Sequence, residues 1–293
     1  MPSIPVEADS ERRIVVRLVT TLESERRREP VDLKEMAASK DLKVGTCVME
    51  FISPGIGKIV KQAGADFVFF DMEHNGYSFD SLNHLLRFFE AADLPLLLRP
   101  PSKSYHHVAH ALDLGARALL LPHIRSAEEA RQILDWMRYP PEGSRGVALG
   151  IAHDNYRPAA HDEVMGAANR EIGFFVTLEN ADGLAEVEEI AAIDGVDGLV
   201  LGHNDLSSSL GVAGRWDNPT FAEAVDRVAA ACAAHGKSYG RLVTTPKEGQ
   251  ELFDTGADLI ICSGDIWLFM DALRSMIDDV RDLCRGEAGA ARG

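Results

Sequence analysis

Short apolar runs alternate with longer amphipathic segments along most of the chain. The apolar runs are rich in Val, Ile, Leu and Phe, a composition typical of buried strands. Eight strands are expected, at 43–49, 66–71, 94–99, 117–122, 173–179, 196–202, 237–243 and 258–263. Segments with apolar residues at helical spacing separate them. Helices are expected at 55–63, 80–91, 105–114, 126–137, 182–191, 219–235, 246–255 and 265–284.

Glycines mark several of these boundaries. Gly64, Gly115 and Gly256 each stand between an expected helix and the next strand, where the left-handed conformation that glycine tolerates ends a helix. Eight strand–helix units of this length predict an α/β fold, the (β/α)8 TIM barrel. A doubly wound open sheet is the alternative. It is disfavoured because no G-x-G-x-x-G motif follows an early strand.

Three parts are expected along the chain. Residues 1–31 are polar and carry a dense run of charges, so we interpret them as an N-terminal extension with a helix near 10–28. Residues 32–285 hold the barrel, and the Gly- and Ala-rich tail 286–293 is expected to be disordered. The connection 138–172 is too long and too rich in Gly and Pro for a simple loop. Such loops at a barrel mouth tend to cover or complete a site.

Charge and composition exclude several classes of partner. The net charge of −16 disfavours nucleic acid, whose phosphates would be repelled. No apolar run approaches the roughly 20 residues that span a bilayer, and the first residues lack the apolar core of a signal peptide. The four cysteines form no C-x-x-C pair and are expected to be reduced thiols: Cys47, Cys232, Cys262 and Cys284. The sequence therefore predicts a cytoplasmic protein with neither nucleic-acid nor membrane partners.

Polar side chains begin abruptly where the expected strands end, and in a barrel these ends surround one site. They are Asp71, Glu73, His74, Arg99, His123, Glu179, Asp205 and the segment 263–265. Glu179 and Asp205 are the most informative pair, because each follows a strongly apolar strand. Two hard oxygen ligands, with room left for water and substrate, suit a divalent ion. Mg²⁺, Mn²⁺ and Co²⁺ are all compatible with this pair.

Several motifs together resemble the HpcH/HpaI aldolase family. They are DMEHNGYSFDSL (71–82), LLLRPP (96–101), LDLGARALLLPHIRSAEEARQ (112–132), RYPPEGSRGV (138–147), TLEN (177–180) and GHNDLSSSLG (202–211). The resemblance covers about residues 32–275, in order and with similar spacing. The family comprises metal-dependent class II pyruvate aldolases, in one superfamily with the citrate lyase β subunit. The resemblance implies a (β/α)8 barrel and a homo-oligomer, a hexamer with a swapped C-terminal helix in several members.

The resemblance also implies roles for individual residues. Glu179 and Asp205 match the metal ligands, and Arg99 matches the arginine that stabilises the enolate. His74 and Asp71 match a pair that serves proton transfer, with the Asp71 carboxylate orienting the imidazole.

The segment from Gly202 through His203 and Asn204 matches the site for the carboxylate of the 2-oxo acid. Two departures from the family lie next to it. His203-Asn204 stands where many members have Pro-Ala, and Thr177 stands where a glutamine is common. These residues are expected to bind substrate and to bear on which 2-oxo acid fits. His203 is interpreted as a pocket wall or hydrogen-bond donor rather than as an added ligand.

The expected activity is reversible cleavage of a 4-hydroxy-2-oxo acid into pyruvate and an aldehyde through a metal-stabilised enolate. A Schiff-base mechanism would need a lysine at a strand's carboxyl end, whereas Lys43 and Lys237 stand at strand starts. The alternative is a citrate-synthase-like or citryl-lyase-like enzyme that uses another 2-oxo acid such as oxaloacetate. A barrel without catalytic activity, used only for binding, is a third reading. It is disfavoured because Glu179, Asp205 and Arg99 are all present.

Overall fold

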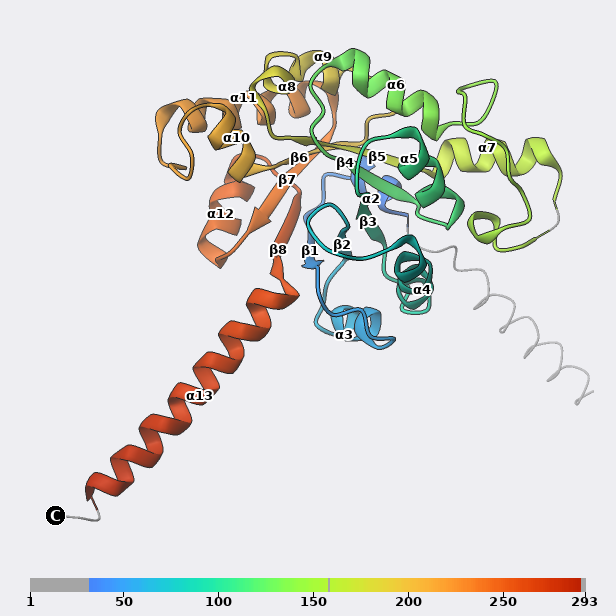
Figure 1. Cartoon of the computed structure of the whole chain (residues 1–293). Coiled ribbons are helices and arrows are strands. Elements are labelled where there is room, and N and C mark those ends of the chain that lie inside the picture. Colours follow the sequence, from blue (N-terminus) through green and yellow to red (C-terminus); the bar gives the residue numbers. More distant parts are fainter. Residues whose placement is uncertain (1–31, 158, 291–293) are drawn as a thin grey trace, which may run out of the picture. The chain divides into compact units, whose positions relative to one another are not determined.

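The computed structural model describes residues 32–157 and 159–290, and within them eight parallel strands form a closed barrel (Figure 1). Each strand pairs with the next one in the sequence, and β1 closes the ring against β8. The predicted (β/α)8 barrel is therefore confirmed. The helix expected near 10–28 and the end of the expected disordered tail, 291–293, lie outside the described residues.

The strands are β1 (Lys43–Val48), β2 (Phe67–Asp71), β3 (Leu96–Arg99), β4 (Ala118–Leu121), β5 (Gly173–Leu178), β6 (Gly198–Leu201), β7 (Ser238–Val243) and β8 (Leu259–Gly264). The helices before the long connection are α2 (Leu33–Ala38), α3 (Ile56–Gln62), α4 (Phe79–Glu90), α5 (Tyr105–Asp113) and α6 (Ala127–Met137). The later ones are η1 (Ala152–Asp154), α7 (His161–Glu171), α8 (Ala181–Ala185), α9 (Val187–Ala191), α10 (His203–Ser209), α11 (Pro219–His235), α12 (Pro246–Asp254) and α13 (Asp265–Ala290).

Two apolar layers hold the barrel together, because alternate residues of each strand point inward and outward. One cluster fills the interior and includes Cys47, Phe67, Leu97 and Phe175. A larger cluster packs the outer strand faces against the surrounding helices. Leu33 of α2 belongs to the interior cluster, so α2 packs against the barrel filling rather than among the outer helices. Polar groups lie beyond this filling at both ends of the strands: Lys43, Ser238 and Asp258 at the amino ends, and Asp71, Arg99 and Glu179 at the carboxyl ends.

Some elements differ from the expected ones. The helix expected at 182–191 is divided into α8 and α9 at Glu186, whose side chain accepts a hydrogen bond from the backbone N–H of Ala127 over 2.8 Å. The backbone of Glu186 is not helical (φ −109°, ψ 21°), and its side chain is held at the start of α6. The connection 138–172 contains η1 and α7 rather than loop alone. The last helix runs to Ala290, six residues beyond its expected end at 284.

Helix α13 contacts β1 and β8 at its start and then leaves the barrel (Figure 1). Much of its apolar surface is exposed, at Trp267, Leu268, Phe269, Met270, Leu273, Met276, Ile277, Val280 and Leu283. No helix in the described part of the chain has both the length and the apolar character needed to cross a membrane. Contiguous exposed apolar surface of this extent is typical of interaction sites.

Candidate active site

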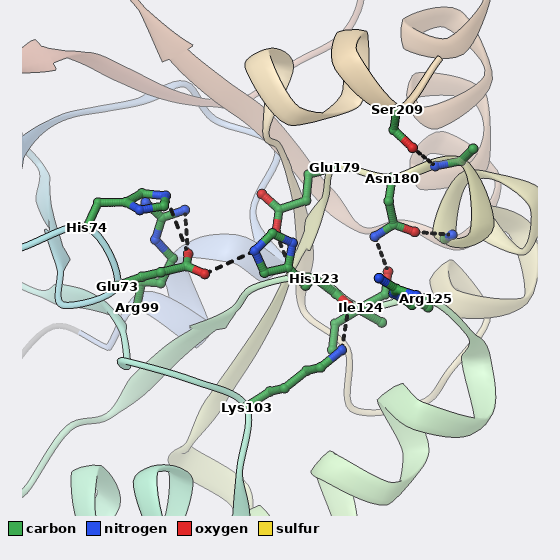
Figure 2. Close-up of polar contacts among 12 residues, drawn as sticks. Glu73, His74, Arg99, Lys103, His123, Ile124, Arg125, Glu179, Asn180 and Ser209 are labelled. Carbon is green, nitrogen blue, oxygen red and sulfur yellow. Dashed lines mark hydrogen bonds and ion pairs between the residues drawn. The ribbon is translucent and has the colours of Figure 1, made fainter. Parts of the chain in front are cut away.

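An arginine held by two carboxylates lies at the carboxyl ends of β2 and β3. Asp71 and Arg99 end these strands and are register partners. Arg99 Nε donates to Asp71 Oδ1 over 2.8 Å and Arg99 Nη2 donates to Asp71 Oδ2 over 2.7 Å, which makes a bidentate pair. Arg99 Nη1 lies 3.2 Å from Glu73 Oε2 (Figure 2). Burial alone would lower the pKa of Arg99, but the hydrogen bond to Asp71 and its charge raise the pKa, so the guanidinium stays charged.

A third carboxylate, Glu179, directly follows β5 and is only 2% exposed. Its Oε1 accepts the backbone N–H of His123 over 2.5 Å, whereas no hydrogen bond to its Oε2 exists within the described residues. Burial raises the pKa of Glu179, and the hydrogen bond and charge of His123 only partly oppose this. Gly202 makes room for it, because a Cβ there would lie 2.6 Å from Glu179 Oε2. Glu179 is thus a buried carboxylate with one oxygen free of protein donors.

His123 joins these two clusters. Its Nδ1 lies 3.2 Å from Glu179 Oε1 and its Nε2 lies 3.1 Å from Glu73 Oε1 (Figure 2). Sequence reasoning placed His123 on the rim but gave it no role. The available signal was its place immediately after the fourth strand, one residue beyond Pro122. The structure therefore contains one continuous polar chain, which runs from Asp71 through Arg99, Glu73 and His123 to Glu179.

The expected contact between Asp71 and His74 is absent among the described side chains. The Asp71 carboxylate instead pairs with Arg99 and accepts a hydrogen bond from the backbone N–H of Glu73 over 2.9 Å. The His74 side chain is 55% exposed, and its Nε2 lies 3.8 Å from Glu73 Oε2. The physical reason is that β2 ends at Asp71. The Asp71 side chain still has the inward direction of the strand, whereas His74 belongs to the bend that follows. His74 nevertheless stays at the site, since it and Arg99 face the same carboxylate oxygen (Figure 2).

Glu179 and Asp205 carry carboxylate oxygens, the donor type that divalent ions such as Mg²⁺ prefer. Asp205 lies in the first turn of α10, three residues after Gly202, and is exposed. In the described part of the chain, no group of three or more His, Cys, Asp or Glu side chains is placed to hold a metal ion. Two carboxylates alone would leave most coordination positions to water and substrate. The hydroxyl of Thr177, two residues before Glu179 on the same inward face, is buried without a hydrogen-bond partner among the described residues. An orphaned donor beside a free carboxylate oxygen indicates a site built for a polar ligand.

His203 packs against an aromatic side chain. Its ring meets the ring of Trp216 edge to face, with centroids 5.4 Å apart. Burial lowers the pKa of His203, and the positive charge of Arg241 lowers it further. The ring therefore lies between an aromatic neighbour and a nearby positive charge. Asn204, the next residue of α10, is exposed.

Asp265 ties the first loop of the rim to α13. Its carboxylate accepts the backbone N–H groups of Met49, Glu50 and Phe51 over 3.1, 2.9 and 2.8 Å. The ring of Phe51 also meets Phe269 of α13 edge to face at 5.5 Å. This support was missed in the sequence, because the partners are more than 200 residues apart.

Asp265→Ala is expected to lower stability. Three backbone donors would lose their shared acceptor, at a cost of about 1–3 kcal/mol. For a domain of this size each kcal/mol corresponds to roughly 2–4 °C in Tm. The measurement is a calorimetric melt, with Asp265→Asn as the control, because its amide oxygen keeps part of the interaction. An unchanged Tm in Asp265→Ala would contradict this assignment.

A closed barrel with a charged cluster at the carboxyl ends of its strands defines the class of (β/α)8 barrel enzymes. The family model described as HpcH/HpaI aldolase/citrate lyase matches residues 51–272. The chain belongs to this family, and the predicted membership is confirmed.

Individual relatives agree with this assignment. The chain is 33% identical over 235 residues to a hydroxypyruvate/pyruvate aldolase of Deinococcus radiodurans, covering 80% of this chain and 84% of the relative. It is 28% identical over 249 residues to a 5-keto-4-deoxy-D-glucarate aldolase of Klebsiella pneumoniae, covering 85% and 96%. A solved HpcH/HpaI aldolase/citrate lyase family protein from Burkholderia cenocepacia superimposes with a TM-score of 0.80 at 30% identity, covering 85% of this chain and 98% of that one.

Proposed function

We propose that this enzyme is a class II aldolase, which reversibly cleaves a 4-hydroxy-2-oxo acid into pyruvate and an aldehyde. The observation that carries the proposal is the buried Glu179, which keeps one oxygen without a hydrogen bond among the described residues and is linked through His123 and Glu73 to Arg99. The names of the relatives, pyruvate aldolases among them, support the choice of pyruvate as the donor. Membership of an aldolase family supports the carbon–carbon lyase chemistry.

Glu179 and Asp205 are the residues that would hold the divalent ion. When bound, such an ion acts as a Lewis acid toward the keto oxygen of the substrate. Mg²⁺, Mn²⁺ and Co²⁺ all suit this donor set.

Arg99 is arranged to stabilise negative charge on the same oxygen. A guanidinium has five N–H donors. Two are committed to Asp71 and one faces Glu73, which leaves two for the substrate. Because the carboxylates fix its orientation before substrate arrives, little reorganisation is needed as charge develops.

The remaining roles concern protons and the substrate carboxylate. We assign His74 to move the proton of the substrate hydroxyl, since its exposed imidazole lies at the rim beside Glu73. The contacts of Asp71 with Arg99 and with the loop support a positioning role for this residue. The backbone of Gly202, His203 and Asn204 is assigned to the carboxylate of the 2-oxo acid, with the Thr177 hydroxyl as a further donor.

Proton exchange tests this function without knowledge of the aldehyde. In D₂O with Mn²⁺ or Mg²⁺, the methyl protons of pyruvate should exchange, and EDTA should stop the exchange. Proton NMR follows the loss of the methyl signal. Absence of exchange in protein that binds Mn²⁺, together with turnover of oxaloacetate, would refute pyruvate as the donor and favour the citrate-synthase-like alternative.

We also propose that the enzyme is a homo-oligomer, a hexamer by family resemblance, assembled through α13. Met276, Val280 and Leu283 are exposed at helical spacing on one apolar stripe. The double substitution Met276→Glu/Val280→Glu is expected to reduce the molar mass measured by light scattering to that of a smaller assembly. Ser275→Glu, on the same helix at a polar position, is the control and should leave the mass unchanged. A monomeric parent protein would refute the proposal.

A further inference from the structure

The imidazole of His123 lies between two carboxylates whose parent strands are not neighbours. Its Nδ1 faces Glu179 at 3.2 Å and its Nε2 faces Glu73 at 3.1 Å. A neutral ring can donate to one of them, and a protonated ring can donate to both. The ring is half exposed, so it stands at the mouth of the site rather than in the core. A residue so placed is able to set the orientation of both side chains at once.

The backbone of His123 contributes a second contact to the same carboxylate. Its φ is 55°, in the left-handed region that residues other than glycine rarely adopt. In this conformation its N–H donates to Glu179 Oε1 over 2.5 Å. Lys103 also holds the segment, since its Nζ donates to the His123 carbonyl over 2.6 Å (Figure 2). Strained backbone of this kind persists only where the surrounding structure fixes it, and it is concentrated at functional sites.

Both His123 contacts fall on the same oxygen of Glu179. Oε1 receives the backbone N–H and faces Nδ1, while Oε2 has no hydrogen bond within the described residues. With Oε1 held in this way, Oε2, which lies beside Gly202, is the oxygen left for an ion. Partners of this kind orient the ligands of metal sites, and their loss typically costs about 10–100-fold in metal affinity.

We propose that His123 is a positioning residue that holds Glu179 in the orientation required to bind the divalent ion and links this ligand to Glu73 and Arg99. The inference rests on the proposed function, because it assigns Glu179 as a ligand. His123 itself is not a ligand in this assignment. Its two ring nitrogens face carboxylates on opposite sides of the ring, so neither is directed at an ion shared with Glu179.

Two substitutions of His123 test the contacts of its two ring nitrogens separately. The asparagine amide is attached at Cγ, as Nδ1 is, so His123→Asn retains a donor toward Glu179 and loses the one toward Glu73. The glutamine amide reaches one atom further, as Nε2 does, so His123→Gln retains the donor toward Glu73 only. Asparagine and glycine also tolerate a positive φ. His123→Gly therefore removes the ring while keeping the backbone conformation.

The experiment measures Mn²⁺ dissociation constants by EPR for the full-length protein and these variants, with His84→Asn, an exposed histidine of α4, as the control. We expect His123→Gly and His123→Gln to bind Mn²⁺ about 10-fold more weakly or worse. His123→Asn and the control should stay within a few-fold of the parent. A difference in Mn²⁺ affinity between His123→Asn and His123→Gln would not arise from a general structural role of His123. Thermal melts of the metal-free proteins check that each variant folds.

The outcomes distinguish failure of the proposed metal site from failure of the positioning role of His123. If the parent does not bind Mn²⁺, or if Glu179→Gln binds it equally well, the proposed metal site fails. If Glu179→Gln loses binding while all His123 variants retain the parent affinity, the positioning role fails alone. Strong ¹⁴N coupling to Mn²⁺ that disappears in His123→Gly would also overturn it, because the ring would then be a ligand.

Discussion

Glu179→Gln is expected to abolish metal-dependent pyruvate exchange. The amide has the same size and therefore fits beside Gly202, but it lacks the charge that a divalent ion requires. The loss in Mn²⁺ affinity should exceed the roughly 10–100-fold that removal of an outer partner costs. EPR measures the binding and proton NMR measures the exchange.

The same variant should fold at least as well as the parent in the absence of metal. Burial raises the pKa of Glu179, which means that the charged form is penalised in the folded protein. A neutral amide removes that penalty, so the Tm without metal should hold or rise. Glu128→Gln on the exposed face of α6 serves as the matched control and should change neither quantity. Parent-like exchange by Glu179→Gln would remove this residue from the site.

Arg99→Lys is expected to lower kcat by about 10²–10³-fold, the cost of losing a preorganised donor to a developing oxyanion. Lysine keeps the positive charge, but its compact ammonium cannot bond both oxygens of Asp71 in a fork or hold a fixed direction toward the substrate. Mn²⁺ affinity should stay within a few-fold of the parent, because Arg99 is not a ligand. Exchange rates and EPR titrations on the same samples separate these two effects.

Arg117→Lys provides the control for this pair, since its Nη1 lies 3.2 Å from Glu171 on the exposed surface. Surface pairs of this kind contribute little to stability, so the variant should resemble the parent in both assays. An Arg99→Lys enzyme with undiminished exchange would show that charge alone is sufficient. A variant with strongly weakened Mn²⁺ binding would show that Arg99 acts on the metal site rather than on the substrate.

The barrel was predictable from the sequence because its signal is local. A buried parallel strand is a short apolar run, and each run here ends at a polar residue that marks the rim. Asp71, Arg99 and Glu179 were therefore placed correctly at strand ends before any pairing was known. The family motifs carried the expected chemistry, since they are continuous stretches such as 71–82 and 202–211.

The pairings at the site were not predictable in the same way. The family resemblance suggested that Asp71 orients His74, yet the register of β2 and β3 pairs Asp71 with Arg99, 28 residues away. His123 meets Glu179 across 56 residues, and its left-handed backbone has no signature in the sequence. The contact of Glu186, at the division of the helix expected at 182–191, with Ala127 of α6 likewise spans 59 residues.

The sequence by itself thus determined the repeating strand–helix units, the family and the set of polar residues that reach the rim. The tertiary structure decided which of them touch: Asp71 with Arg99, Glu73 with His123, and His123 with Glu179. The physical reason is closure of the barrel. The apolar pattern of a strand depends only on neighbouring residues. Contacts across the mouth of the barrel depend on strand register and on the direction that the backbone takes after each strand ends.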